Sequence, residues 1–95
     1  MFDTSVVRTY HDNEQTKLKE EYFYNNEKIE GIYKLYYYSG ELKLEVSYVN
    51  GKKHGLERKY YRNGVLHWEY IFNNDKIIES KEYNENGELN NILFI

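Results

Sequence analysis

The sequence contains no cysteine and no proline. Without cysteine the chain forms no disulfide, no thiolate metal site and no cysteine nucleophile, and its redox compartment stays undetermined. Without proline, almost every backbone N–H can donate, as a sheet of many paired strands requires. The composition therefore permits an extensively hydrogen-bonded β-structure.

Long apolar runs and an excess of basic charge are also missing. No stretch approaches the roughly 18 apolar residues that cross a bilayer, and Met1 to Ser5 carries an aspartate where a secretory signal is basic. The net charge is −3, with Lys and Arg scattered among acids, which argues against a groove for nucleic-acid phosphates. We expect a soluble, cytoplasmic protein that binds no nucleic acid.

Aromatic residues, by contrast, are abundant. They make up 18% of the 95 residues, and twelve of them are tyrosine, whose apolar ring and polar tip suit half-exposed sheet faces. A chain of this length is expected to form a single domain, 1–95, with a thin core.

The sequence repeats with a step of 24 residues, as the alignment of Gly31 to His54 with Gly55 to Ile78 shows. A step of this length marks one supersecondary unit repeated along the chain. Weaker copies flank the two clear ones, as expected where end units cap an array. The matched positions are Gly31 and Gly55, Tyr36 and Tyr60, Tyr37 and Tyr61, Gly40 and Gly64, Leu42 and Leu66, Glu45 and Glu69, and Tyr48 and Phe72.

Each 24-residue unit is predicted to form a β-hairpin. Ser39-Gly40 and Asn63-Gly64 are predicted to be two-residue turns with positive φ at both positions. Asn50-Gly51 is predicted to join one hairpin to the next in the same way, with 25–27 and 73–75 in its place in the neighbouring copies. The structural turn glycines are Gly40, Gly51, Gly64 and Gly87.

Counting outward from the turns gives the register of the strands. A slip of one residue would move every side chain to the other face, so the register can be checked by the pairs it creates. It places apolar residues together on one face and opposite charges together on the other. The predicted pairs are Tyr37–Leu42, Leu35–Leu44, Tyr33–Val46 and Lys34–Glu45, then Tyr61–Leu66, Lys59–Trp68, Glu57–Tyr70 and Arg58–Glu69.

The predicted fold is all-β: a single-layer antiparallel meander of four stacked hairpins, about eight strands in an elongated, twisted sheet. The hairpins span approximately 6–24, 31–48, 55–72 and 79–94. No segment has helical spacing of apolar residues, so no helix should cover either face. One face, expected to be concave and buried, carries Tyr33, Leu35, Tyr37, Leu42, Leu44, Val46, Tyr48, Tyr61, Leu66, Trp68, Tyr70 and Phe72.

The recurring pattern Y-Y-x-N/S-G-x-L, then E-x-x-Y/F-x-N-G-K and G-x-x-x-x-Y-Y, resembles the MORN repeat, in particular the variant common in bacterial proteins. The resemblance covers essentially the whole chain, strongly over Gly31 to Phe72 and weakly at both ends. It implies a single-layer sheet of stacked hairpins with an aromatic-lined groove. It also implies attachment or membrane-contact roles, and the bacterial variant includes proteins described as antitoxins.

Histidine and carboxylate side chains are the candidates for a metal site or for acid–base catalysis. His11, His54 and His67 fall in different units without metal-site spacing, and we interpret them as surface residues, with His67 facing Tyr60. The carboxylates of Glu21, Glu45 and Glu69 form a column at 24-residue intervals. Because Glu45 and Glu69 each oppose a cation, Lys34 or Arg58, the column is interpreted as a salt-bridge ladder and not as an acid–base pair. The sequence predicts no catalytic residue, no metal site and no cofactor, and hence no enzyme.

The aromatic stripe leaves two interpretations open. We favour the core of a curled sheet, but a single layer cannot bury both faces. Tyr and Trp also recur in binding hot spots, so the stripe is alternatively a groove for a protein partner. The candidate partner-binding residues are Tyr33, Tyr37, Tyr61, Trp68, Tyr70 and Phe72.

The final strand, "NNILFI", predicts an apolar sheet edge without the proline or lysine that would protect it. Either the N-terminal "FDTSVV" folds over apolar surface, or Leu93 to Ile95 pair with a second chain and form a homo-oligomer.

The leading functional hypothesis is a non-enzymatic protein-interaction scaffold, specifically an antitoxin or immunity-type protein that binds a toxin. The alternative is a peripheral membrane or phosphoinositide-binding module, for which "GKKHGLERK", Gly51 to Lys59, is the one basic cluster available.

Overall fold

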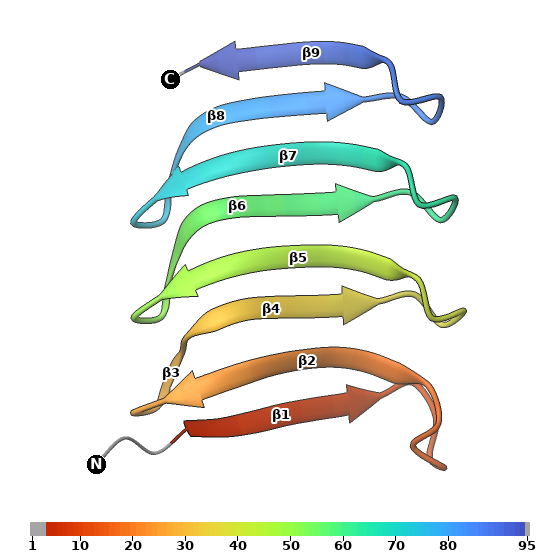
Figure 1. Cartoon of the computed structure of the whole chain (residues 1–95), viewed down its shortest axis with the longest axis vertical. Helices are drawn as coiled ribbons and strands as arrows, with labels where there is room; N and C mark the ends of the chain where they lie inside the picture. The colour runs from red at the N-terminus through yellow and green to blue at the C-terminus, as the bar shows by residue number, and fades with distance from the viewer. Residues whose placement is uncertain (1–3, 95) are drawn as a thin grey trace.

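The computed structural model describes residues 4–94, which form one open antiparallel sheet (Figure 1). The strands follow one another in meander order, and the sheet does not close. The predicted fold class is confirmed, with one short additional strand, β3, that pairs with β2 off the main path. The strands are β1 (Thr4–Tyr10), β2 (Leu18–Asn25), β3 (Lys28–Ile29), β4 (Gly31–Tyr36), β5 (Leu42–Val49), β6 (Lys52–Tyr60), β7 (Leu66–Asn73), β8 (Lys76–Tyr83) and β9 (Leu89–Phe94).

The turns that connect one unit to the next are two-residue turns, as predicted. Asn50 and Gly51 have φ values of 53° and 79°. The corresponding residues 26–27 and 74–75 are also positive in φ although none of them is glycine. Two positive φ values in succession define the type I′ turn, whose twist matches that of the flanking strands.

The turns within the hairpins are different, and here the prediction is wrong. The N–H of Tyr61 donates to the carbonyl of Val65, and the N–H of Gly64 donates to Tyr61, both at 2.9 Å. The loop therefore has three residues, and only its glycine is positive in φ, at 88°. The loop around Gly40 has the same hydrogen bonds. A type I turn followed by a left-handed glycine is the usual three-residue hairpin loop.

A β-bulge follows each three-residue loop. Tyr36 pairs with Leu42, and the next pair is Leu35 with Leu44, so Lys43 is left over. The predicted pairs Tyr37–Leu42 and Tyr61–Leu66 are therefore wrong, and Leu42 and Leu66 pair with Tyr36 and Tyr60 instead. The inner pairs are confirmed: Leu35–Leu44, Tyr33–Val46, Lys34–Glu45, Lys59–Trp68, Glu57–Tyr70 and Arg58–Glu69.

The register divides the side chains between two faces. One face, the aromatic face, contains the row Tyr22, Tyr33, Val46, Glu57 and Tyr70 together with Trp68 and Phe72. The other, the ladder face, alternates in charge from β1 to β8. Its central row is Arg8, Glu21, Lys34, Glu45, Arg58, Glu69 and Lys81, joined strand by strand through the sheet register.

The sheet is thin and buries little. Its extents are 43 × 33 × 13 Å, consistent with a single layer. Within residues 5–94 only Val46, Glu57 and Phe72 are buried, and all three lie on the aromatic face, which matches the prediction that this face holds the core. The same range contains no helix of the length and hydropathy that a membrane crossing needs.

The N-terminal segment does not fold over the sheet where the structure describes it. Residues 4–10 form β1 and pair with β2 at one edge, while β9 forms the opposite edge (Figure 1). The remaining residues of the predicted cover, 2–3, and the last residue of the predicted pairing segment, 95, lie outside the described range.

Candidate partner-binding face

Four of the six predicted partner-binding residues form one continuous chain of rings on β7 and on the residue that follows β6. Tyr61 stacks on His67 with ring centroids 4.1 Å apart, and His67 lies 4.7 Å from Trp68. Trp68 stacks on Tyr70 at 5.6 Å, and Tyr70 meets Phe72 edge-on at 6.2 Å. Aromatic pairs at these separations attract one another beyond simple burial. The ring chain is therefore a preformed surface.

His67 is the member of this chain that the sequence analysis placed wrongly. The predicted contact with Tyr60 required a regular register, but the bulge leaves His67 without a cross-strand partner and turns it toward Tyr61. The 24-residue repeat places Lys43 at the position equivalent to His67. In the structure Lys43 likewise lies beside the preceding tyrosine, 5.5 Å from the ring of Tyr37.

Tyr33 belongs to a second cluster nearer the N-terminus. Its ring lies 5.4 Å from Tyr22, which lies 5.3 Å from Tyr24. The Tyr33 hydroxyl donates to the carboxylate of Glu20, which also accepts from the Thr9 hydroxyl. Burial and the Glu20 carboxylate raise the pKa of Tyr33 well above its usual value. Tyr33 is thus held as a neutral hydrogen-bond donor.

Tyr37 joins successive units instead of extending the ring chain. Its hydroxyl donates to the carbonyl of Tyr60 at 2.6 Å, and the Tyr61 hydroxyl makes the same bond to Tyr83 at 2.8 Å. Each of these tyrosines therefore ties its own unit to the next. The Arg62 guanidinium lies 5.4 Å from the Tyr37 ring, within the range of a cation–π contact.

Cations cover the rings of the aromatic face, a feature that sequence reasoning missed. The Lys59 ammonium lies 4.5 Å from the Trp68 ring, and that of Lys53 lies 5.1 Å from Phe72. The indole Nε1 of Trp68 is buried and has no hydrogen-bond partner within residues 4–94. The aromatic face is consequently amphipathic and not purely apolar.

A buried ion pair lies at the centre of this face. Lys53 Nζ is 2.7 Å from Glu57 Oε1, and the Glu57 side chain is almost fully enclosed. Burial is the largest single influence on the pKa of Lys53 and would lower it, but the hydrogen bond to Glu57 and the charges of Glu57, Tyr48 and Asp75 together raise it. The pair forms because β6 is irregular between its pairings with Val46 and Tyr48, which regular counting could not show.

The ladder face carries salt bridges at all three predicted carboxylates, although Glu45 is bridged by Arg58 and not by Lys34, its predicted partner. Arg58 Nε lies 2.8 Å from Glu69 and its Nη1 lies 3.8 Å from Glu45, while Arg8 Nε lies 2.8 Å from Glu21. The three carboxylates are thus engaged with cations, as the structural interpretation required. Among the described residues 4–94, no three His, Asp or Glu side chains converge as a metal site would require.

Comparison with known families gives a result for the centre of the chain. The family model of the MORN repeat variant matches residues 29–50 and 53–74. This is a MORN repeat protein. MORN repeats mediate protein or membrane-lipid interactions, and the family is non-catalytic. No curated protein and no solved structure matches the chain. The MORN matches cover β4 to β7, the strands that carry the ring chain and the buried ion pair.

Proposed function

We propose that this MORN repeat protein binds a protein partner through its aromatic face, in the cytoplasm, without catalysing a reaction. The observation that carries the proposal is the continuous chain from Tyr61 to Phe72, which no second layer covers within the described sheet. Tyr61, Trp68 and Tyr70 are of the two aromatic types that recur in binding hot spots.

The partner class that we propose is a toxin, which the chain would neutralise as an antitoxin or immunity protein. A net charge of −3 favours encounter with a small basic protein. The proposal predicts that a basic protein encoded beside this chain arrests growth when expressed alone and that co-expression of the chain restores growth. Growth arrest that the chain does not relieve contradicts the antitoxin assignment and leaves the binding face to be tested separately.

The binding face is tested by affinity capture from the source organism with two matched variants. Trp68→Ala removes the centre of the ring chain, and Phe23→Ala removes a half-buried ring from the ladder face. We expect Trp68→Ala to lose the captured protein and Phe23→Ala to retain it, with both variants folded by circular dichroism. Equal capture by both variants, or loss with Phe23→Ala alone, contradicts the proposal.

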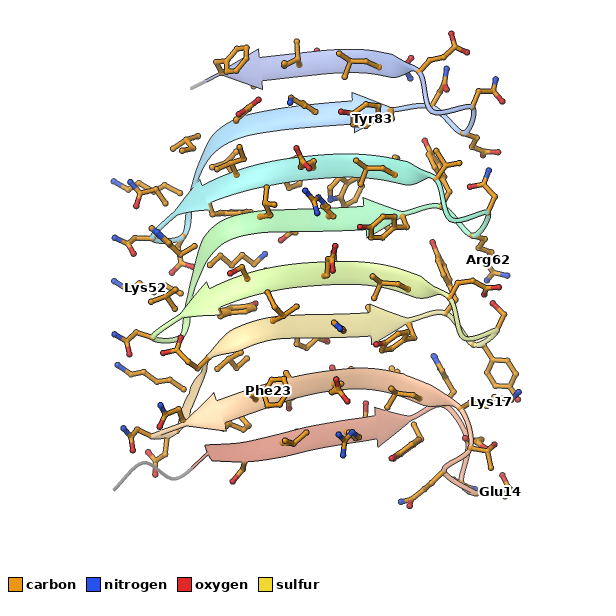
Figure 2. The ribbon with its side chains drawn as sticks, viewed as in Figure 1. Glu14, Lys17, Phe23, Lys52, Arg62 and Tyr83 are labelled. Carbon is orange, nitrogen blue, oxygen red and sulfur yellow. The ribbon has the colours of Figure 1, made fainter. Side chains whose placement is uncertain are left out.

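Membrane-lipid binding is the alternative function, and the position of the basic cluster weakens it. Lys53 and Lys59 point to the aromatic face, whereas Arg58 lies in the charge ladder on the other. Lys53 and Arg58 are each already paired with a carboxylate. Figure 2 shows Lys52 at one end of the strands and Arg62, the next basic residue after the cluster, at the other end. The cluster therefore presents no single cationic surface to anionic lipid.

Sedimentation with vesicles, with and without anionic lipid, separates the two functions. We expect no binding to either vesicle. Binding to anionic vesicles that is abolished by neutralising Lys52, Lys53 and Lys59 would establish the lipid function in place of the protein one. The predicted self-association uses a different surface, the β9 edge.

A further inference from the structure

The last strand, β9, is an apolar open edge. Within the described part of the chain, 4–94, it pairs only with β8, so one row of its backbone N–H and C=O groups has no strand beside it. All six of its residues are exposed. Its large apolar side chains are exposed by 51% at Leu89, 42% at Ile92, 53% at Leu93 and 70% at Phe94. An edge of this kind is a template for a further strand.

The opposite edge of the sheet differs from β9 in charge and polarity. Strand β1 carries Arg8, which is paired with Glu21, and it is rich in serine and threonine. Strand β9 has no charged residue and no proline, so it lacks the features that commonly prevent pairing at an edge. A strand added at β9 would meet no unpaired charge.

The apolar residues of β9 lie on both faces of the sheet. Ile92 is opposite Lys81 on the ladder face, and Phe94 follows on that face. Leu93 is opposite Ser80 on the aromatic face. A pairing strand would therefore bury apolar surface above and below the sheet, in addition to completing the backbone hydrogen bonds.

We propose that β9 pairs antiparallel with β9 of a second copy of this chain, which extends the sheet across a twofold axis. Residues that lie opposite one another in a sheet point to the same face. A shift of one residue between the two β9 strands would place residues of opposite faces together, so only every second register is possible. The register with Leu93 opposite its own counterpart also places Ile92 opposite Phe94 of the second copy. Apolar residues then meet apolar residues on both faces.

Head-to-tail pairing of β9 with β1 is the competing arrangement, and the charge ladder gives it no support. The charges of the ladder alternate in sign as far as Lys81 on β8, and the residue opposite Lys81 on β9 is the uncharged Ile92. Arg8 of the following copy would then lie two strands from Lys81, about 9.6 Å away at the usual strand spacing. Each of these cations already has a carboxylate within its own copy, Glu21 at 2.8 Å and Glu79 at 3.4 Å, so the junction adds no new opposite-charge pair. Twofold pairing separates the Lys81 residues by three strand spacings and closes the assembly. It also places both aromatic faces on the same side of one continuous sheet.

Two measurements test the dimer. Sedimentation equilibrium should give twice the chain mass of 11.6 kDa. Ile92→Lys should restore the single-chain mass, because a lysine at an edge prevents pairing. The matched control is Ile32→Lys: Ile32 is also 42% exposed on the ladder face, but it lies on β4 inside the sheet, so the dimer should persist. Circular dichroism verifies that both variants fold.

A variant of β1 distinguishes twofold from head-to-tail pairing. Val6→Lys, at a residue exposed by 44% on β1, should leave the dimer intact. Because the chain has no cysteine, Leu93→Cys should also form a disulfide dimer on oxidation, whereas Val6→Cys should not. The proposal is overturned by a single-chain mass at all concentrations, by a dimer that survives Ile92→Lys, or by a mass that grows without limit and collapses with Val6→Lys.

Discussion

At the scale of single residues, the aromatic face is stabilised by polar groups as much as by rings. Tyr33 is held by Glu20, and Tyr37 and Tyr61 are tied to the carbonyls of the following unit. Lys53 and Glu57 form an ion pair where a core residue would be expected. A single-layer sheet has too little apolar volume to bury its centre by rings alone, so these polar contacts complete the face.

The ion pair gives a prediction about stability. Lys53→Met leaves the enclosed Glu57 carboxylate without its partner and should lower the free energy of unfolding by about 1–3 kcal/mol. The Lys53 side chain is itself about one third exposed, so the effect should lie toward the lower end. Replacing both residues by methionine should recover most of the loss. Urea denaturation at neutral pH measures all three proteins, and a double variant that is less stable than Lys53→Met contradicts this role.

Asp12 gives a prediction about pH. Its carboxylate accepts from the Thr16 hydroxyl and from the backbone N–H groups of Lys17 and Thr16, which lower its pKa below the ordinary 3.8. A lowered pKa means that this stabilisation is fully present above the unfolded-state pKa and is lost as pH falls through the folded value. Asp12→Asn should therefore melt below the wild type at neutral pH.

The difference in melting temperature between Asp12→Asn and the wild type should close as pH falls below 3.8. Differential scanning fluorimetry over a pH series measures it. A difference that is constant with pH would show that the carboxylate charge does not stabilise the first loop.

At the scale of elements, two types of turn alternate along the sheet. Type I′ turns connect the units, and three-residue loops with a left-handed glycine close the last three hairpins, while a longer loop with Gln15 at positive φ closes the first. The sequence did not distinguish them, because Asn50-Gly51 and Asn63-Gly64 have the same residues but different neighbours. Local propensity permits both turn types at Asn-Gly, and the flanking strands select between them.

The register was nevertheless predicted for most of each hairpin because two deviations cancel. A three-residue loop shifts the strands by one position from the expected pairing, and the bulge at Lys43 shifts them back. Leu35 therefore meets Leu44 as predicted, although Leu42 does not meet Tyr37. The error remains only between the loop and the bulge, where it also misplaced His67.

The type I′ turn at 26–27 allows a stabilising substitution. Glu27 has a φ of 65°, in the left-handed region, which costs a residue with a Cβ about 1–2 kcal/mol. Glu27→Gly removes this strain but gives the unfolded chain more freedom, worth about 0.4–1 kcal/mol. We expect a net stabilisation of about 0.5–1 kcal/mol. Thermal and urea denaturation measure it.

Glu27→Ala is the control for this turn, because it removes the same carboxylate but retains the Cβ and therefore the strain. It should match the wild type or be slightly less stable. If Glu27→Ala stabilises as much as Glu27→Gly, loss of the charge and not relief of the backbone would be the cause.

At the scale of the whole molecule, the chain is an open sheet with one amphipathic aromatic face, one charge-ladder face and two unequal edges. Its fold followed from the 24-residue step, since repeat length, turn residues and alternating side chains all specify the same hairpin. The buried ion pair and the ring contacts did not follow, because they depend on bulges that a two-residue period does not reveal. Of the predicted binding residues, the sequence indicated a shared face but not that Tyr33 lies in a separate cluster.

Trp68 is the only tryptophan in the chain, so its indole reports on the aromatic face without ambiguity. The most direct test of the proposed function is the indole N–H resonance of ¹⁵N-labelled protein, recorded alone and with the captured partner. Partner binding at the aromatic face predicts that this one resonance shifts or broadens, because Trp68 lies at the centre of the ring chain. A stable complex in which the indole resonance does not move would show that the partner binds elsewhere.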